Sequence, residues 1–177
     1  MSSQDNSENQ GIKLKQGEIS ANDLITKGIR AHLKGDVINA ELIYKEVLTL
    51  GVLNAYILSN YGVICMNTGR IDKAKSLLKL AIKKFPEKAE AYNNLGSIYK
   101  SENNLKEALI CFNKAISLKD NYIAAHYNLS SLYIDQKNVK QAYIHAQKTI
   151  NLEQNHAEAY VNMGKIERLK GDLDKSK

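Results

Sequence analysis

Residues 89–122 carry the clearest pattern in the chain and read AEAYNNLGSIYKSENNLKEALICFNKAISLKDNY. In the first half, large apolar residues are spaced i, i+3 and i+7, as on one face of an α-helix, at Tyr92, Leu95 and Tyr99. The pair Asn103-Asn104, typical of turns, follows. A second helical face comes next, with Leu105, Ala108, Phe112, Ala115 and Ile116. The stretch therefore predicts two helices joined by a tight turn.

The same arrangement recurs with a period of 34 residues. One column of the repeat holds small residues, at Gly28, Gly62, Gly96 and Gly164, with Ser130 in the remaining place. A second column holds alanine, at Ala40, Ala74, Ala108 and Ala142. A third column favours turns, with Gly35, Gly69, Asn103, Lys137 and Gly171. Because glycine and alanine leave no bulk, we expect the paired helices to approach closely at the first two columns.

The period divides the chain into four full repeats and a partial fifth, at 21–54, 55–88, 89–122, 123–156 and 157–177. Residues 1–20 lack a periodic apolar pattern, and we expect them to form a disordered polar leader. Each repeat contributes two helices, and neighbouring repeats bury a shared core. The sequence therefore predicts an all-α fold.

The residues at fixed places in the repeats resemble those of the tetratricopeptide repeat family. The third repeat matches the family pattern best, with Tyr92, Leu95, Gly96, Tyr99, Ala108, Phe112, Ala115 and Asp120. The second follows, with Leu58, Tyr61, Gly62, Cys65, Ala74, Leu78, Ala81 and Pro86. The resemblance implies a right-handed α-solenoid of antiparallel helix pairs, in which the first helix of each pair lines a concave groove.

The partial fifth repeat leaves two interpretations open. Its first helix is expected over roughly Ala157 to Lys170, but only six residues follow Gly171, and an isolated helix needs about 12. The sequence is either a fragment or shortened product of a longer protein, or this helix itself caps the array.

Composition excludes several classes of protein. No apolar run approaches the ~18 residues that a membrane span needs. The first residues lack the basic and apolar blocks of a secretory signal. Two cysteines cannot form a disulfide framework, so a cytoplasmic location is expected.

No motif typical of an enzyme occurs in the sequence. The four histidines make no i, i+4 pair, and no HExxH, CxxC or phosphate-binding glycine loop occurs. His126 occupies an aromatic position of its repeat, so we expect it to pack, and Cys65 and Cys111 are expected to be small buried residues. We therefore expect a non-catalytic chain with no cofactor and no metal site.

The groove of the resembling family suggests where a ligand would bind. The resemblance places asparagines at the same groove position of four repeats, at Asn60, Asn94, Asn128 and Asn162, with Tyr56 and Tyr127 nearby. Carboxamides donate and accept hydrogen bonds, so a row of them can hold the backbone of an extended peptide. The row is similar to one in the repeat region of protein O-linked N-acetylglucosamine transferases. The alternative is that these side chains are solvated or bonded locally.

The predicted function is a protein- or peptide-binding scaffold whose partner occupies the concave groove. The first alternative is the substrate-targeting arm of a truncated glycosyltransferase-like or other transferase enzyme. A third hypothesis, RNA binding through the net charge of +6, is not favoured, because the lysines spread over outward positions without interleaved aromatics.

Ile25 and Ile29 replace the lysine and asparagine with which relatives clamp chaperone C-termini, which argues against a co-chaperone. The oligomeric state stays open.

Overall fold

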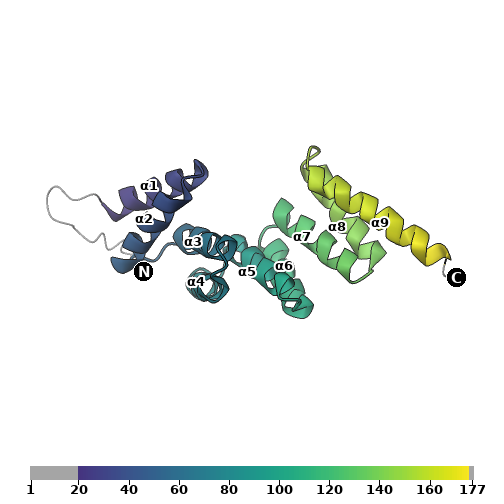
Figure 1. Ribbon diagram of the computed structural model, residues 1–177, viewed down its shortest axis with the longest axis horizontal. Helices are drawn as coiled ribbons and strands as arrows, with labels where there is room; N and C mark the ends of the chain where they lie inside the picture. The colour runs from purple at the N-terminus through teal and green to yellow at the C-terminus, as the bar shows by residue number, and fades with distance from the viewer. Residues whose placement is uncertain (1–19, 176–177) are drawn as a thin grey trace, which may run out of the picture. The chain divides into compact units, whose positions relative to one another are not determined.

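The computed structural model describes residues 20–175, with side chains as far as Asp172. Within that range the protein consists of nine α-helices and contains no strand, which confirms the predicted all-α class (Figure 1). The helices are α1 (Ala21–Leu33), α2 (Val37–Thr49), α3 (Ala55–Asn67), α4 (Ile71–Lys84), α5 (Ala89–Ser101), α6 (Leu105–Leu118), α7 (Ile123–Asp135), α8 (Val139–Leu152) and α9 (Ala157–Lys175). The predicted leader lies outside the described residues, except for Ser20.

The chain forms two compact units, Met1–Leu53 and Asn54–Lys177. The boundary falls at the junction of the first two predicted repeats. In the first unit α1 pairs with α2. Ser20 caps α1 by accepting a hydrogen bond from the Asp23 amide at 3.1 Å, so this last residue of the predicted leader belongs to the helix start.

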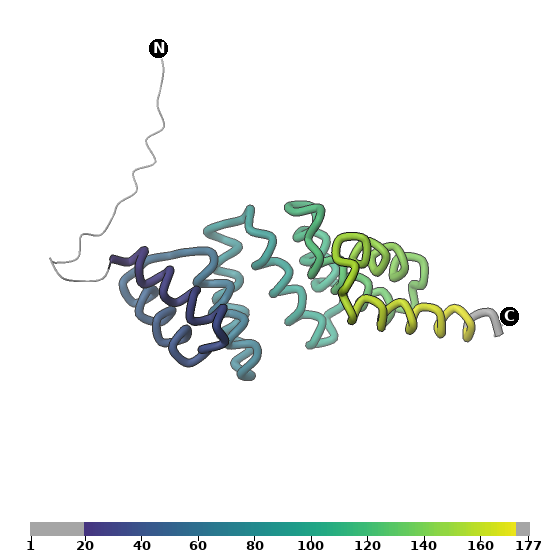
Figure 2. The backbone as a smooth tube through the Cα atoms, turned by 90° about the horizontal axis from the view of Figure 1, so that it is seen from above, coloured from purple at the N-terminus to yellow at the C-terminus, as the bar shows by residue number. Residues whose placement is uncertain are grey.

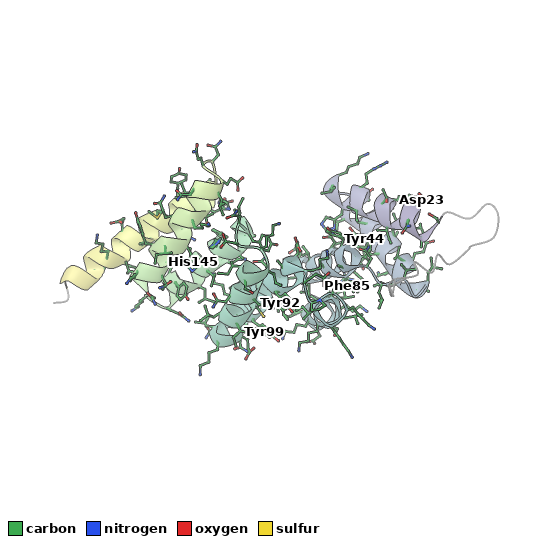
Figure 3. All side chains as sticks on the ribbon, turned by 180° about the vertical axis from the view of Figure 1, so that it is seen from behind. Asp23, Tyr44, Phe85, Tyr92, Tyr99 and His145 are labelled. Atoms are coloured by element: carbon green, nitrogen blue, oxygen red, sulfur yellow. The ribbon has the colours of Figure 1, made fainter. Side chains whose placement is uncertain are left out.

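Close approach of the paired helices occurs where the small residues were predicted. A Cβ atom on Gly28 would lie 2.8 Å from the Tyr44 ring, in the first unit. In the second unit, Gly62 lies beneath Leu78 and Gly96 beneath Phe112, where the added atom would be 3.0 Å and 2.7 Å away. The alanines of the second column are fully buried, at Ala40, Ala74, Ala108 and Ala142. Figure 3 labels Tyr44, the side chain that lies against Gly28.

The turns between paired helices use the third column. Gly35 and Gly69 have φ of +77° and +76°, and Asn103 and Lys137 have φ of 59° and 57°. The left-handed conformation is available to glycine at no steric cost and to asparagine at a low one, so lysine is the unusual occupant. The shared conformation at these four places gives each full repeat the same reversal of chain direction.

In the second unit, the first helices of the pairs lie on the inside of the stack. Among the described residues, α3 contacts α5, α5 contacts α7 and α7 contacts α9, whereas α4, α6 and α8 do not contact one another. Because the first helices lie closer together than the second helices, the stack curves toward the first helices. The face formed by α3, α5, α7 and α9, called the inner face below, is therefore the concave one. Figure 2 shows the antiparallel hairpins following one another along this unit.

The core of the second unit runs through the contacts between pairs. Phe112 and Ala108 of α6 pack against Leu129 and Leu132 of α7, with Tyr99 and Tyr133 beside them. Farther along, Ala142 and Ala146 of α8 pack on Ile166 of α9. Each repeat thus completes the core of its neighbour, as a solenoid requires.

The last helix departs from the sequence-based expectation. α9 continues through Gly171 to Lys175, instead of turning there, and no atom lies within 4 Å of a Cβ built on Gly164. Gly164 is therefore exposed rather than wedged against a second helix. The physical reason is that glycine adopts helical φ as readily as the left-handed φ of a turn, so Gly171 allows the helix to continue.

His126 packs inside the fourth repeat. Its Nε2–H donates to the Asp120 carbonyl at 2.8 Å, so its Nδ1 accepts from Nδ1 of His145 at 3.0 Å. The two rings stack with centroids 5.2 Å apart, and Tyr133 stacks on the other histidine at 5.7 Å. Burial, and then the nearby His126, lower the pKa of His145 from 6.5 to about 4. Figure 3 labels His145.

Gly96→Ala is expected to destabilise the protein by about 1–3 kcal/mol, because the new methyl group would overlap the buried Phe112 ring at 2.7 Å. Urea unfolding measures the change. Gly164→Ala is the matched control: with no atom within 4 Å, it should stabilise the protein by roughly 0.5–1 kcal/mol through helix propensity. Equal effects of the two substitutions would contradict the packing described here.

The free energy of unfolding should fall as pH decreases between about 6.5 and about 4. The unfolded chain protonates His145 near pH 6.5 and the folded chain only near pH 4, so protons favour the unfolded state in this window. Protonation of His145 lowers the free energy of unfolding by at most about 3 kcal/mol. His145→Gln keeps a donor toward His126 but does not titrate. Its urea-unfolding midpoint should depend less on pH than that of the wild type; parallel curves would contradict the assignment.

Candidate functional site

The inner face is hollowed between α3 and α5. The hollow has a volume of about 210 Å³ and is lined by Ala55, Tyr56, Ser59, Asn60, Lys88, Glu90, Asn94 and Tyr122. Three of the residues singled out from the sequence therefore meet in one place, namely Tyr56, Asn60 and Asn94. Tyr56 is 55% exposed and lies in the first turn of α3, where Asn54 caps the helix by accepting from the Tyr56 amide at 2.9 Å. The cap fixes the direction in which this tyrosine leaves the backbone.

Charged and phenolic groups border the same hollow. Glu90 lies 3.8 Å from the ammonium of Lys119, which in turn lies 4.9 Å from the centre of the Tyr122 ring. Burial, and then the charge of Glu90, raise the pKa of Tyr122 to about 12. The phenol is therefore neutral at physiological pH and can donate a hydrogen bond. The sequence analysis missed Tyr122, although an aromatic residue just ahead of a predicted helix was a visible signal.

Asn128 is bonded locally. Its Nδ2 donates to Asn93 Oδ1 at 2.9 Å and to Ser97 Oγ at 3.4 Å. Asn93 is buried and directs its own amide to Asn94 Oδ1 at 3.4 Å. These side chains form a polar network that joins α5 to α7. At this position the structure agrees with the alternative of local bonding, and Asn128 is half-buried.

The position of Asn162 differs from the one expected in the predicted row of asparagines. It is only 2% exposed and lies in the contact of α9 with α7, where its Nδ2 approaches Ser130 Oγ at 3.5 Å. The serine hydroxyl gives the buried carboxamide a partner. The fourth asparagine therefore supports helix packing and does not face the groove.

Tyr127 lies apart from the other predicted contact residues. Its ring stacks on His156 with centroids 5.2 Å apart, and the side chain is half-buried. It lines neither the hollow that contains Tyr56 nor the second hollow described next.

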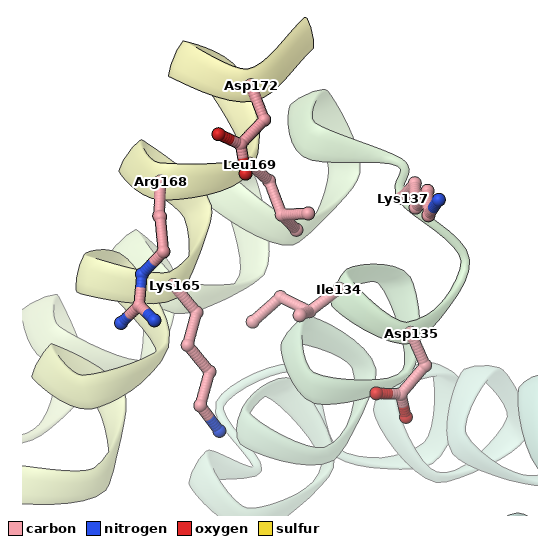
Figure 4. A pocket seen from close by; sticks show the side chains of 7 residues that line it. All are labelled: Ile134, Asp135, Lys137, Lys165, Arg168, Leu169 and Asp172. Carbon is pink, nitrogen blue, oxygen red and sulfur yellow. The ribbon is translucent and has the colours of Figure 1, made fainter.

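A second hollow of about 260 Å³ lies between α7 and α9 (Figure 4). It is lined by Ile134, Asp135, Lys137, Lys165, Arg168, Leu169 and Asp172. Figure 4 shows the apolar Ile134 and Leu169 converging from opposite helices, with Lys165 and Arg168 beside them on α9. Asp135 also faces Lys100 of α5 at 3.3 Å, and the same ammonium donates to Ser131 at 2.6 Å. Asp172 lies beyond the helix end predicted near Lys170, whereas Leu169 lies inside the predicted helix and was not singled out.

The described side chains form no metal-binding cluster. Across residues 20–172, no group of three or more His, Cys, Asp or Glu side chains could hold a metal ion. Cys65 and Cys111 are both buried, and burial raises the pKa of the Cys111 thiol to about 11. Over residues 20–175, none of the helices is long and apolar enough to cross a membrane.

Comparison with known proteins identifies the repeats. Residues 55–86 and 89–122 each match a family model described as tetratricopeptide repeat. The human tetratricopeptide repeat protein 7A is 27% identical over 89 residues, which are 50% of this chain and 10% of that protein. The chain thus spans about a tenth of the length of this curated relative. Two of the predicted repeats, the second and the third, are thus identified as tetratricopeptide repeats.

Solved structures agree with the fold. The MamA protein superimposes with a TM-score of 0.69 at 28% identity, covering 88% of this chain and 85% of that one. A tetratricopeptide repeat protein from Parabacteroides merdae gives a TM-score of 0.68 at 23% identity, over 88% and 62% of the two chains. The first repeat domain of Spaghetti (RPAP3), solved with a peptide of HSP90, gives a TM-score of 0.61 at 19% identity. The match covers 68% of this chain and 93% of that one. The all-α repeat solenoid is therefore shared.

Asn128→Ala should destabilise the protein by about 1–3 kcal/mol, because it leaves the buried Asn93 carbonyl without its 2.9 Å donor. Urea unfolding measures the loss. Asn94→Ala removes only a 3.4 Å contact and should cost less. If the two variants are equally stable, the network does not hold α5 to α7.

Proposed function

We propose that the inner face of Asn54–Lys177 binds an extended polypeptide segment, and that the protein acts as a protein-binding scaffold. The observation that carries the proposal is the hollow between α3 and α5, where the exposed Tyr56 stands beside Asn60 and Asn94. An exposed tyrosine supplies apolar contact area and a polar tip at low entropic cost, as anchors of interfaces do.

The amides suit recognition of a peptide backbone. Asn94 is half-buried at the edge of the hollow, and its carboxamide can donate to a peptide carbonyl. The neutral phenol of Tyr122 adds a second donor across the same space. Donors of this kind read the backbone and tolerate varied side chains, so affinity for many related sequences is expected.

The second hollow suggests which ligand side chains are preferred. Lys165 and Arg168 offer two cations beside the apolar Ile134 and Leu169. An acidic residue next to an apolar one on the ligand would match both features. The RPAP3 domain was solved with an HSP90 peptide, and this supports peptide binding by the fold. Because Ile25 and Ile29 stand where relatives clamp chaperone C-termini, we propose a different ligand for this chain.

Peptides selected from a random 12-residue library on the immobilised protein provide the test. Tyr56→Ala and Asn94→Ala should each weaken binding of a selected peptide by about 3- to 10-fold in fluorescence anisotropy, which corresponds to ~0.5–1.5 kcal/mol per lost contact. The control is Ile110→Ala, a side chain 61% exposed on α6, away from the inner face. Unchanged affinity in both inner-face variants, or failure to select any peptide, would contradict the proposal.

A further inference from the structure

A third hollow, called the outer hollow below, lies between the second helices α4 and α6, with α5 as its floor. Its volume is about 400 Å³, and none of the described residues that line it also lines the hollow between α3 and α5. The half-buried Tyr92 and Tyr99 of α5 and the buried Cys111 of α6 line its interior. The outer hollow is therefore built by internal helices of the second unit and is distinct from the inner face.

The small side chain of Cys111 leaves this space open. The equivalent residues of the other three full repeats are larger, namely Ile43, Leu77 and His145. In the fourth repeat the imidazole of His145 stacks on His126 and Tyr133, with ring centroids 5.2 Å and 5.7 Å away. Those two residues stand 34 positions after the two tyrosines of the outer hollow. The outer hollow is therefore the place at which the next repeat holds an aromatic ring of its own.

Cations border the outer hollow. Lys79 and Lys83 lie one turn apart on α4, and Lys114 lies on α6; all three are exposed. Among the described residues, none of these three ammonium groups forms an ion pair. Glu107 is the one carboxylate in the lining, so positive charge prevails. One repeat later the two positions on α4 are taken by neutral residues, Asn113 and Ser117.

We propose that the outer hollow binds an aromatic side chain of a partner polypeptide, and that acidic residues next to this side chain pair with Lys79, Lys83 and Lys114. The ring would stack on the two tyrosines of α5, as His145 stacks on its two neighbours in the fourth repeat. The protein would then hold a second partner on its outer side while the inner face is occupied.

An acidic polypeptide fits the outer hollow better than a nucleic acid. Leu95, Ile110 and Cys111 line the interior and offer the polar edge of a base no strong hydrogen-bond partner, whereas a phenyl ring has no polar edge to satisfy. The lysines lie at the exposed border, where charge complementarity selects the partner more than it adds affinity. The aromatic ring therefore supplies most of the affinity, and the acidic neighbours supply the specificity.

The probe is a displayed library of 12-residue peptides with one central aromatic residue and acidic residues at half of the other positions, selected on the full chain under reducing conditions. Cys111→His introduces the ring of the fourth repeat and should weaken binding of a selected peptide by about 10-fold in fluorescence anisotropy. The matched control is Cys111→Ala, which keeps the Cβ atom that faces Gly96 and leaves the hollow open. It should bind as the wild type does.

A second pair of variants tests the charges. The double substitution Lys79→Gln and Lys83→Gln should weaken the selected peptide by about 3- to 10-fold, and added salt should reduce the difference. The control is Lys73→Gln with Lys106→Gln, which removes the same charge from α4 and α6 outside the lining and should leave the affinity unchanged. Equal losses in the two double variants would show attraction to net charge alone and overturn the proposal.

The inner-face variants Tyr56→Ala and Asn94→Ala should leave this peptide's affinity unchanged, so the proposal fails or holds independently of the proposed function. If circular dichroism shows that Cys111→His does not fold, Ile110→Ala replaces it and should weaken binding about 3-fold.

Three results overturn the proposal. The first is that the library yields no binder, or that folded variants of the outer hollow bind as the wild type does. The second is that a 12-nucleotide single strand displaces the peptide and loses affinity with the Lys79 and Lys83 substitutions. The third is self-association in sedimentation velocity that the same substitutions abolish, because a second copy of the chain would then occupy the hollow.

Discussion

The structure depends on the close contact of two helices at one small residue in each pair, which is glycine in three pairs and Ser130 in the fourth. Gly62 and Gly96 allow a large side chain of the facing helix to lie directly on the backbone. Because the approach is that close, the alanine four residues before the large side chain is also fully buried. Each pair is therefore a rigid unit, and the spacing of 34 residues places identical units in register for stacking.

Contacts between the first helices of successive pairs determine which helices form the inner face. The first helices touch one another along the stack, while the second helices are separated, so the inner face is continuous from α3 to α9. Tyr56 and Asn94 come together because α3 contacts α5, although 38 residues separate them in the chain.

The repeat pattern predicted the helices, their pairing and most turns, because these depend on residue size and spacing. Lys137 shows the strength of the periodic constraint, since it adopts the left-handed turn conformation despite its side chain. The sequence could not predict the fate of Asn128 and Asn162, whose bonds go to Asn93, Ser97 and Ser130 on neighbouring helices. The columns of Gly164 and Gly171 predicted a close helix contact and a turn, whereas nothing lies within 4 Å of the Gly164 Cβ position and α9 runs through Gly171.

The network of Asn93, Asn94 and Asn128 has a practical consequence. Buried Asn93 takes part in two different bonds: its oxygen accepts from Asn128 of α7, whereas its amide donates to Asn94 on its own helix. Only the first of these bonds joins α5 to α7. A change at Asn94 therefore removes a bond within one helix and leaves the 2.9 Å tether between the two repeats in place.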